Sequence, residues 1–136
     1  MDTAIAPCGC PATLHVPLLS GGQAARQARQ ATARLLSQEA DACPREVADD
    51  LALIVSELVG NAVLHADGPY ALTLSLERGR AGVAVSDGTA DLSGSHRDAQ
   101  RTEPGGRGLK IVRALGADLF VSPCGRGKQV IAVLTW

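Results

Sequence analysis

The chain has 136 residues, of which 46% are hydrophobic but only 2% aromatic, and its formal net charge is −1. This length fits one domain that buries a core without a disulfide or metal staple, and the core must be built from Ala, Val, Leu and Ile. Nucleic-acid-binding surfaces need basic patches and aromatic stacking platforms, so this composition excludes direct binding to nucleic acid.

Residues 1–12 contain no basic stretch followed by a long apolar run, so we expect a flexible leader and not a signal peptide. No apolar run approaches the roughly 20 residues of a membrane span. We therefore expect a cytoplasmic protein that makes no membrane contact and keeps its cysteines reduced. Cys8 and Cys10 are spaced too closely for the common zinc-ligand pairs. Residues 13–136 are expected to form the folded domain.

The first half of that domain reads as one strand and two helices. Residues 13–19 are a predicted strand, which Pro17 places at a sheet edge because proline cannot donate to a strand ladder. Residues 23–40 predict a helix with one apolar face, made of Ala24, Ala28, Ala31, Leu35 and Leu36. Pro44 suits the start of a second helix at about 45–66. Its apolar residues recur at helical spacing: Val47, Leu51, Ile54, Val55, Leu58 and Ala62.

The second half reads as two hairpins separated by a long loop and a short helix. Residues 70–77 (YALTLSLE) alternate strictly and pair with residues 81–86 across a turn. Residues 87–106 lack periodicity, and a loop of that length is typical of a lid or binding loop. Residues 109–115 predict a short helix. The closing strands are expected at 118–122 and 129–134.

The order of these elements predicts an α+β fold, because helices do not alternate singly with strands. We expect a mixed, mostly antiparallel sheet with helices on one face.

Three segments could carry chemistry, and the first is a polar ridge on the second helix. Glu57, Asn61 and His65 are four residues apart and therefore lie on one helix face. Carboxylate and amide oxygens are ligands that Mg²⁺ accepts together with phosphate oxygens and water. The alternative interpretation is the solvated flank of an amphipathic helix.

The second segment is Asp87-Gly88, at the end of a predicted strand, where the carboxylate could accept from the amine of an adenine; a simple turn is the alternative. The third is a glycine-rich run that opens into a helix, where backbone amides and the helix dipole favour phosphate. That run is Gly105, Gly106, Arg107, Gly108 and Leu109. Together, the three segments are the parts of an ATP site.

The motif order Glu57-x-x-x-Asn61, then Asp87-Gly88, then Gly106-x-Gly108-Leu109 resembles the N, G1 and G2 boxes of the GHKL family of ATP-binding proteins, which includes gyrase and histidine kinases. The phrases SELVGNAVLHA and GGRGLKIVRALGAD look most like its small bacterial branch, the anti-sigma-factor serine kinases. The resemblance implies the family's two-layer α/β sandwich, the Bergerat-type ATP-binding fold, over residues 13–136.

The resemblance also implies roles for individual residues. It implies that Asn61 coordinates Mg²⁺, that Glu57 is the base toward the attacking hydroxyl and that Asp87 contacts the adenine amine. His65 would flank the site. The remaining positions implied to bind nucleotide are Gly88, Gly105, Gly106, Arg107, Gly108, Leu109 and Lys128. The implied cofactors are ATP and Mg²⁺.

Two departures from the family pattern are visible. The G1 box, Asp-x-Gly-x-Gly in the family, reads Asp-Gly-Thr-Ala-Asp at residues 87–91, and the closing Gly-Thr pair is Gly127-Lys128.

Two functions from different classes follow from the resemblance. One is an ATP-dependent protein-serine kinase that sequesters a sigma factor and phosphorylates a STAS-type anti-sigma-factor antagonist, with a homodimer as the expected assembly. The alternative is a non-catalytic partner-binding module whose nucleotide site is degenerate or structural, as the altered G1 box would favour. A free-standing ATPase fits less well, because the sequence predicts no second domain to receive mechanical work. A histidine kinase fragment also fits less well, because no dimerisation helix pair with a phospho-accepting histidine is predicted.

Overall fold

A computed structural model describes residues 12–19, 22–89 and 104–136, with side chains from residue 109 onward in the last segment. In chain order the elements are β1 (Ala12–Leu18), α1 (Gln23–Gln38), the short 3₁₀ helix η2 (Ala40–Ala42), α2 (Arg45–His65), β2 (Tyr70–Glu77), β3 (Arg80–Asp87), α4 (Pro104–Ala114), β4 (Asp118–Cys124) and β5 (Gly127–Thr135). The predicted leader lies almost entirely outside the described residues.

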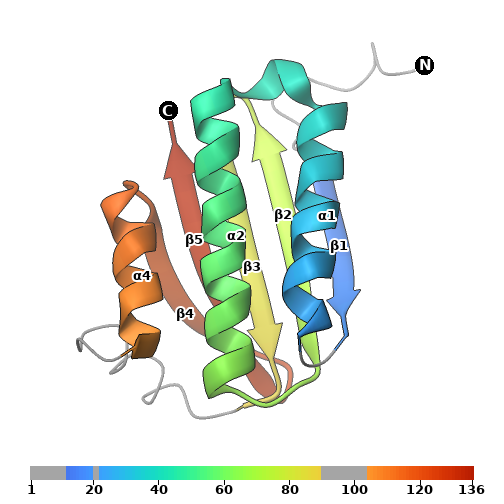
Figure 1. Ribbon diagram of the computed structural model, residues 1–136, viewed down its shortest axis with the longest axis vertical. Coiled ribbons are helices and arrows are strands. Elements are labelled where there is room, and N and C mark those ends of the chain that lie inside the picture. The colour runs from blue at the N-terminus through green and yellow to red at the C-terminus, as the bar shows by residue number, and fades with distance from the viewer. Residues whose placement is uncertain (1–11, 20–21, 90–103) are drawn as a thin grey trace.

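The strands form one sheet in the order β1-β2-β3-β5-β4, and the α-helices lie together on one face of it (Figure 1). The predicted two-layer α+β fold is therefore confirmed. All four neighbouring strand pairs in the described part of the chain are antiparallel, so no parallel pair interrupts the sheet there.

The core lies between the sheet and the helices, and it is aliphatic as the composition requires. Alternate side chains of β2 and β3 point into it, as the period of two predicts. The buried residues of α2 are Leu51, Ile54, Val55, Leu58, Val59 and Ala62. In α1 the buried face also includes Thr32, which was not predicted. Its burial is tolerated because the hydroxyl donates to the Ala28 carbonyl at 2.7 Å and so loses no hydrogen bond. Ala31 and Leu36 are only half-buried.

The edge position predicted for the first strand is confirmed, since β1 pairs only with β2 in the described sheet. Both hairpins turn on glycine. Gly79 has φ of 83° between β2 and β3, and Gly125 has φ of 59° between β4 and β5. The second turn is tighter than predicted, because Pro123 and Cys124 belong to β4 and Gly127 begins β5.

Helix α4 begins at Pro104, five residues earlier than the sequence predicted. The glycine-rich run therefore forms the first turns of the helix, where a loop was expected at 104–106. Proline at the first helical position explains the early start, since its φ already suits a helix and its missing N–H would have no partner there. The rest of the predicted long loop, residues 90–103, lies outside the described residues.

The backbone of β5 lies so close to β3 at its start that we expect any side chain at Gly127 to lower the free energy of unfolding. A methyl group on Gly127 would overlap the carbonyl oxygen of Asp87 in the neighbouring strand. Gly127→Ala is expected to lower the free energy of unfolding by roughly 3 kcal/mol, the upper end of overpacking costs. Urea denaturation followed by circular dichroism measures this.

The matched control is a glycine without such contact. Gly60 is exposed inside α2, and a methyl group there would meet nothing within 4 Å. Gly60→Ala is expected to raise the free energy of unfolding by about 0.5–1 kcal/mol, because alanine loses less backbone entropy in a helix. Equal stability of the two variants would contradict the close approach of β3 and β5.

Candidate functional site

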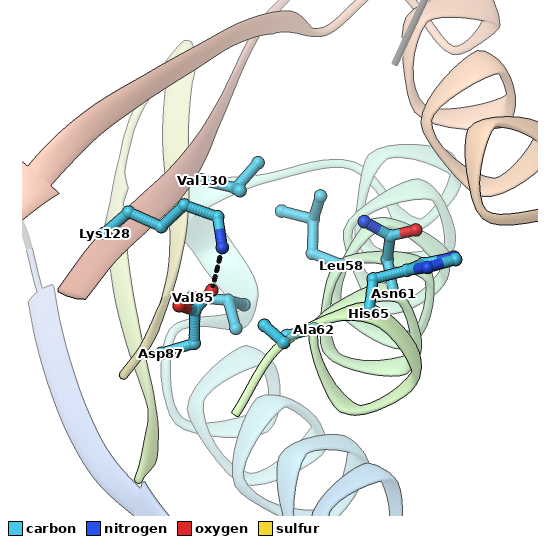
Figure 2. A pocket seen from close by; sticks show the side chains of 9 residues that line it. Leu58, Asn61, Ala62, His65, Val85, Asp87, Lys128 and Val130 are labelled. Carbon is cyan, nitrogen blue, oxygen red and sulfur yellow. Dashed lines mark hydrogen bonds and ion pairs between the residues drawn. The ribbon is translucent and has the colours of Figure 1, made fainter. Parts of the chain in front are cut away.

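A polar pocket lies between α2 and the ends of two strands. From α2 it receives Asn61 and His65, which are one helical turn apart and lie on the predicted ridge (Figure 2). The full lining is Leu58, Asn61, Ala62, His65, Ala66, Val85, Asp87, Lys128 and Val130. The end of α2, the end of β3, the start of β5 and the first turn of α4 all lie at the same end of the molecule (Figure 1). The three segments that the sequence singled out thus converge on one end of the sandwich.

The strand side of the pocket is dominated by a buried ion pair. Asp87, the last residue of β3, lies directly opposite Lys128 of β5 in the sheet register. The Lys128 Nζ donates to Asp87 Oδ2 at 2.9 Å, and each side chain is only 2% exposed. Val85 and Val130 lie two positions from Asp87 and Lys128 in the same strands, and their side chains belong to the core. The ion pair lies on that same face of the sheet and is shielded from water, so removing one partner would leave a buried, unpaired charge at a high cost in free energy.

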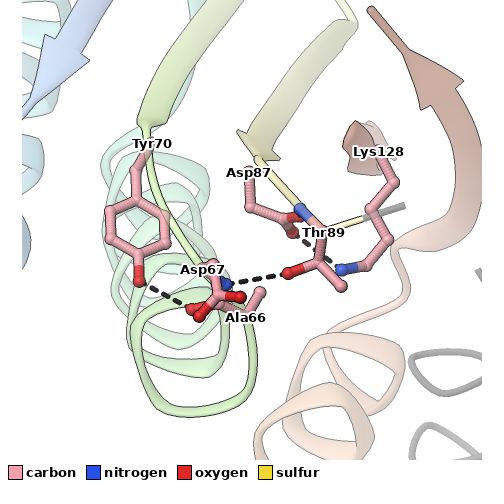
Figure 3. Close-up of polar contacts among 6 residues, drawn as sticks. All are labelled: Ala66, Asp67, Tyr70, Asp87, Thr89 and Lys128. Atoms are coloured by element: carbon pink, nitrogen blue, oxygen red, sulfur yellow. Dashed lines mark hydrogen bonds and ion pairs between the residues drawn. The ribbon is translucent and has the colours of Figure 1, made fainter. Parts of the chain in front are cut away.

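A short hydrogen-bonded network fixes the Asp87 carboxylate from the other side (Figure 3). The Thr89 backbone N–H donates to Asp87 Oδ1 at 2.8 Å, and the Thr89 hydroxyl accepts from the Asp67 N–H at 2.8 Å. The Gly88 N–H donates to the Asp67 carbonyl at 2.6 Å. A side chain on Gly88 would overlap the Gly68 carbonyl oxygen, so the G1 glycine is required for this close packing. The end of β3 is thereby tied to the segment after α2.

Asn61 carries a buried acceptor without a partner among the described groups. Its Oδ1 is shielded from solvent and accepts no hydrogen bond from any described residue. An unsatisfied buried polar atom costs about 1–3 kcal/mol, so a native site normally provides a donor or a cation. An amide oxygen is a ligand that Mg²⁺ accepts together with phosphate oxygens and water, so this one protein oxygen fits the predicted ion.

The other predicted site residues are placed less directly. Glu57 is half-buried one turn before Asn61, outside the pocket lining. Leu109 is 2% exposed and belongs to the hydrophobic core. The backbone of the residues predicted to cradle phosphate lies in the first turns of α4, namely Gly105, Gly106, Arg107 and Gly108. The roles implied for all these residues stay predictions.

Sequence reasoning missed the apolar walls of the pocket and the residue that fixes Asp87. The walls are Leu58, Ala62, Val85 and Val130. The alternation of the strands carried a signal for the last two, since Val85 and Val130 lie two positions from Asp87 and Lys128 and therefore on the same sheet face. No comparable signal pointed to Thr89, whose contacts with residues 67 and 87 depend on the fold.

The free cysteines in the described part of the chain are Cys43 and Cys124. Burial raises the pKa of the Cys43 thiol above its ordinary value, which lowers its thiolate fraction and its reactivity. Within the described ranges, no group of three His, Cys, Asp or Glu residues could hold a metal ion. No helix in the part of the chain described is long and apolar enough to cross a membrane.

The layers and the pocket define a two-layer α/β domain whose polar site opens at one end, between a helix and an antiparallel sheet. The chain belongs to the family of histidine kinase-like ATPase domains, whose model matches residues 22–134. This confirms the GHKL resemblance at the level of the family, while the anti-sigma-factor branch stays a prediction.

Two solved structures are similar to the chain. One is the histidine kinase domain from the blue-light activated histidine kinase EL346 of Erythrobacter litoralis, with 28% identity and a TM-score of 0.49; the match covers 68% of this chain and 46% of that one. The other is the EL346 blue-light activated histidine kinase, with 28% identity, a TM-score of 0.52 and coverage of 68% and 31%. This chain thus matches less than half the length of either structure. No curated protein matches it.

Proposed function

We propose that the chain binds ATP with Mg²⁺ and acts in the cytoplasm as a regulatory protein-serine kinase of the anti-sigma-factor type. Its substrate would be a STAS-type antagonist protein, and its second partner a sigma factor. The observation that carries the proposal is the solvent-shielded Oδ1 of Asn61, a pocket-lining residue, which has no hydrogen-bond partner among the described residues. The family membership supports ATP binding, and the small-branch motifs of the sequence support the serine-kinase role.

The three side chains of the polar ridge on α2 would have different roles in phosphoryl transfer. Asn61 would hold Mg²⁺, which when bound neutralises phosphate charge during phosphoryl transfer. Glu57, one turn earlier, would accept the proton of the substrate hydroxyl, since a carboxylate is a suitable general base. His65, one turn later and exposed, borders the entrance of the pocket. The backbone amides at the start of α4 would face the phosphates, where the helix dipole favours anions.

Calorimetric titration with ATP, in Mg²⁺ and in EDTA, tests this proposal. We expect Mg²⁺-dependent binding in the unmodified chain and a loss of about ten-fold or more in Asn61→Ala, in line with losing one charge-assisted contact of about 1.5–3 kcal/mol. Asn61→Asp is the matched control, because it keeps an oxygen ligand and should retain the Mg²⁺ dependence. Equal affinity of Asn61→Ala and the unmodified chain would contradict the assignment of Asn61.

A second candidate is favoured by the buried Lys128–Asp87 pair, because it engages the carboxylate implied to read adenine. In this alternative the chain is a non-catalytic module that binds its protein partner independently of nucleotide. Gel filtration of mixtures with a purified antagonist, with and without Mg²⁺ and ATP, separates the two. A kinase that switches partners needs different affinities in different nucleotide states, whereas a pure binding module gives the same complex in both.

A further inference from the structure

The Lys128 ammonium lies inside the apolar part of the pocket. The aliphatic stem of Lys128 begins on the helix-covered face of β5, and the ammonium ends at Asp87 (Figure 2). The surrounding walls are the side chains of Leu58, Ala62, Val85 and Val130. Burying an ammonium among mostly apolar side chains costs free energy unless it is paired, so the ion pair with Asp87 determines its position.

Little space remains around the pair. The cavity between these residues measures about 10 Å³, which is room for one water molecule at most. Both carboxylate oxygens of Asp87 are already engaged, Oδ2 by Lys128 and Oδ1 by the Thr89 N–H. A purine ring cannot enter this part of the pocket while the Lys128 side chain stays there.

We propose that Lys128 is a built-in occupant of the base subsite and that it sets the affinity of this chain for the nucleoside part of its ligand. The proposal rests on the proposed function, because it takes Asp87 and its apolar surroundings as the place for the base. It reverses the role predicted for Lys128, which becomes a competitor of the base. The lysine stem is flexible, so a base can enter when the ammonium leaves Asp87.

Occupancy by Lys128 has a direct consequence for affinity. When only the open state binds, the apparent affinity falls by the fraction of molecules that are open. A subsite that is open in about one of a hundred molecules therefore weakens binding about a hundred-fold. A smaller residue at position 128 should remove that loss, and a residue as long as lysine should not.

Adenosine is the probe, because it carries the base without phosphates and so does not depend on Asn61 or Mg²⁺. Binding is followed by the NMR shifts of the Val85 and Val130 methyl groups. Lys128→Thr is expected to bind adenosine about a hundred-fold more tightly than the unmodified chain. Lys128→Met is the matched control: it leaves Asp87 equally unpaired but keeps a long side chain in the pocket, so it should bind as weakly as the unmodified chain.

A third variant guards against unfolding, since both single variants leave a buried carboxylate without its cation. Asp87→Asn with Lys128→Thr removes both charges and keeps an oxygen that can accept from an amine. It should bind adenosine as Lys128→Thr does, with a normal thermal unfolding transition.

Two results would overturn the proposal. One is adenosine binding by Lys128→Thr and by the double variant that is no tighter than in the unmodified chain. The other is equal tightening in Lys128→Met, which would show that side-chain volume is not the barrier. A failure of the proposed function looks different, because adenosine would enter the opened subsite while Mg²⁺-dependent ATP binding stayed absent.

Discussion

Asp87→Ala is expected to lower the free energy of unfolding by about 3–5 kcal/mol, because it leaves the Lys128 ammonium buried without a partner. The expected loss is large because both side chains are only 2% exposed. The substitution also removes the acceptor of the Thr89 N–H. Urea denaturation monitored by circular dichroism gives the free energy of unfolding, and a matching slope would confirm that only stability changed.

A double variant separates the destabilisation caused by an unpaired buried charge from the net contribution of the ion pair to the free energy of unfolding. Asp87→Leu with Lys128→Met replaces the ion pair by apolar side chains, which is often neutral or stabilising at buried sites. The free energy of unfolding of the double variant should therefore be close to that of the unmodified chain and well above that of Asp87→Ala. A loss below about 1 kcal/mol in Asp87→Ala is the range of an exposed pair, and it would contradict the burial of this one.

Glu57→Ala is expected to reduce phosphoryl transfer to the antagonist protein by about 10²–10⁴-fold, the usual contribution of a positioned general base. ATP binding should be largely spared, because Glu57 is half-buried outside the pocket lining. Transfer of radiolabelled phosphate from ATP measures the first quantity, and calorimetry the second.

The matched control is Glu46→Ala, which removes an exposed glutamate from the first turn of the same helix. Its rate of phosphoryl transfer should equal that of the unmodified chain. Undiminished transfer by Glu57→Ala would remove Glu57 from the mechanism. Loss of transfer together with loss of ATP binding would show instead that Glu57 positions the nucleotide.

The sequence determined the elements whose signals are local. Strict alternation predicted β2 with its observed bounds and β3 to within one residue at each end. The long apolar period of α2 predicted both its extent and most of its buried face, and Pro17 predicted the edge strand. These patterns succeed because each face of an element must be either buried or solvated, whichever neighbours it finally meets.

Other features depended on contacts that no local pattern contains. The early start of α4 at Pro104 ran against a glycine-rich segment with weak helix propensity, which a sequence reading assigns to a loop. Burial of Thr32 became acceptable only when its hydroxyl bonded to a carbonyl of its own helix. The short helix η2 was not predicted, because three residues carry no usable periodicity.

The sequence by itself placed Glu57, Asn61 and His65 on one helix face, because helical spacing is a property of the chain alone. The order of its motifs also indicated the family. Only the tertiary structure joined Asp87 to Lys128, which are 41 residues apart. Their contact requires β3 and β5 to be neighbours and in a register that puts these two residues opposite each other on the core side. A slip of one residue would turn either side chain to the other face of the sheet, so strand pairing and register decide that the two side chains meet inside the pocket.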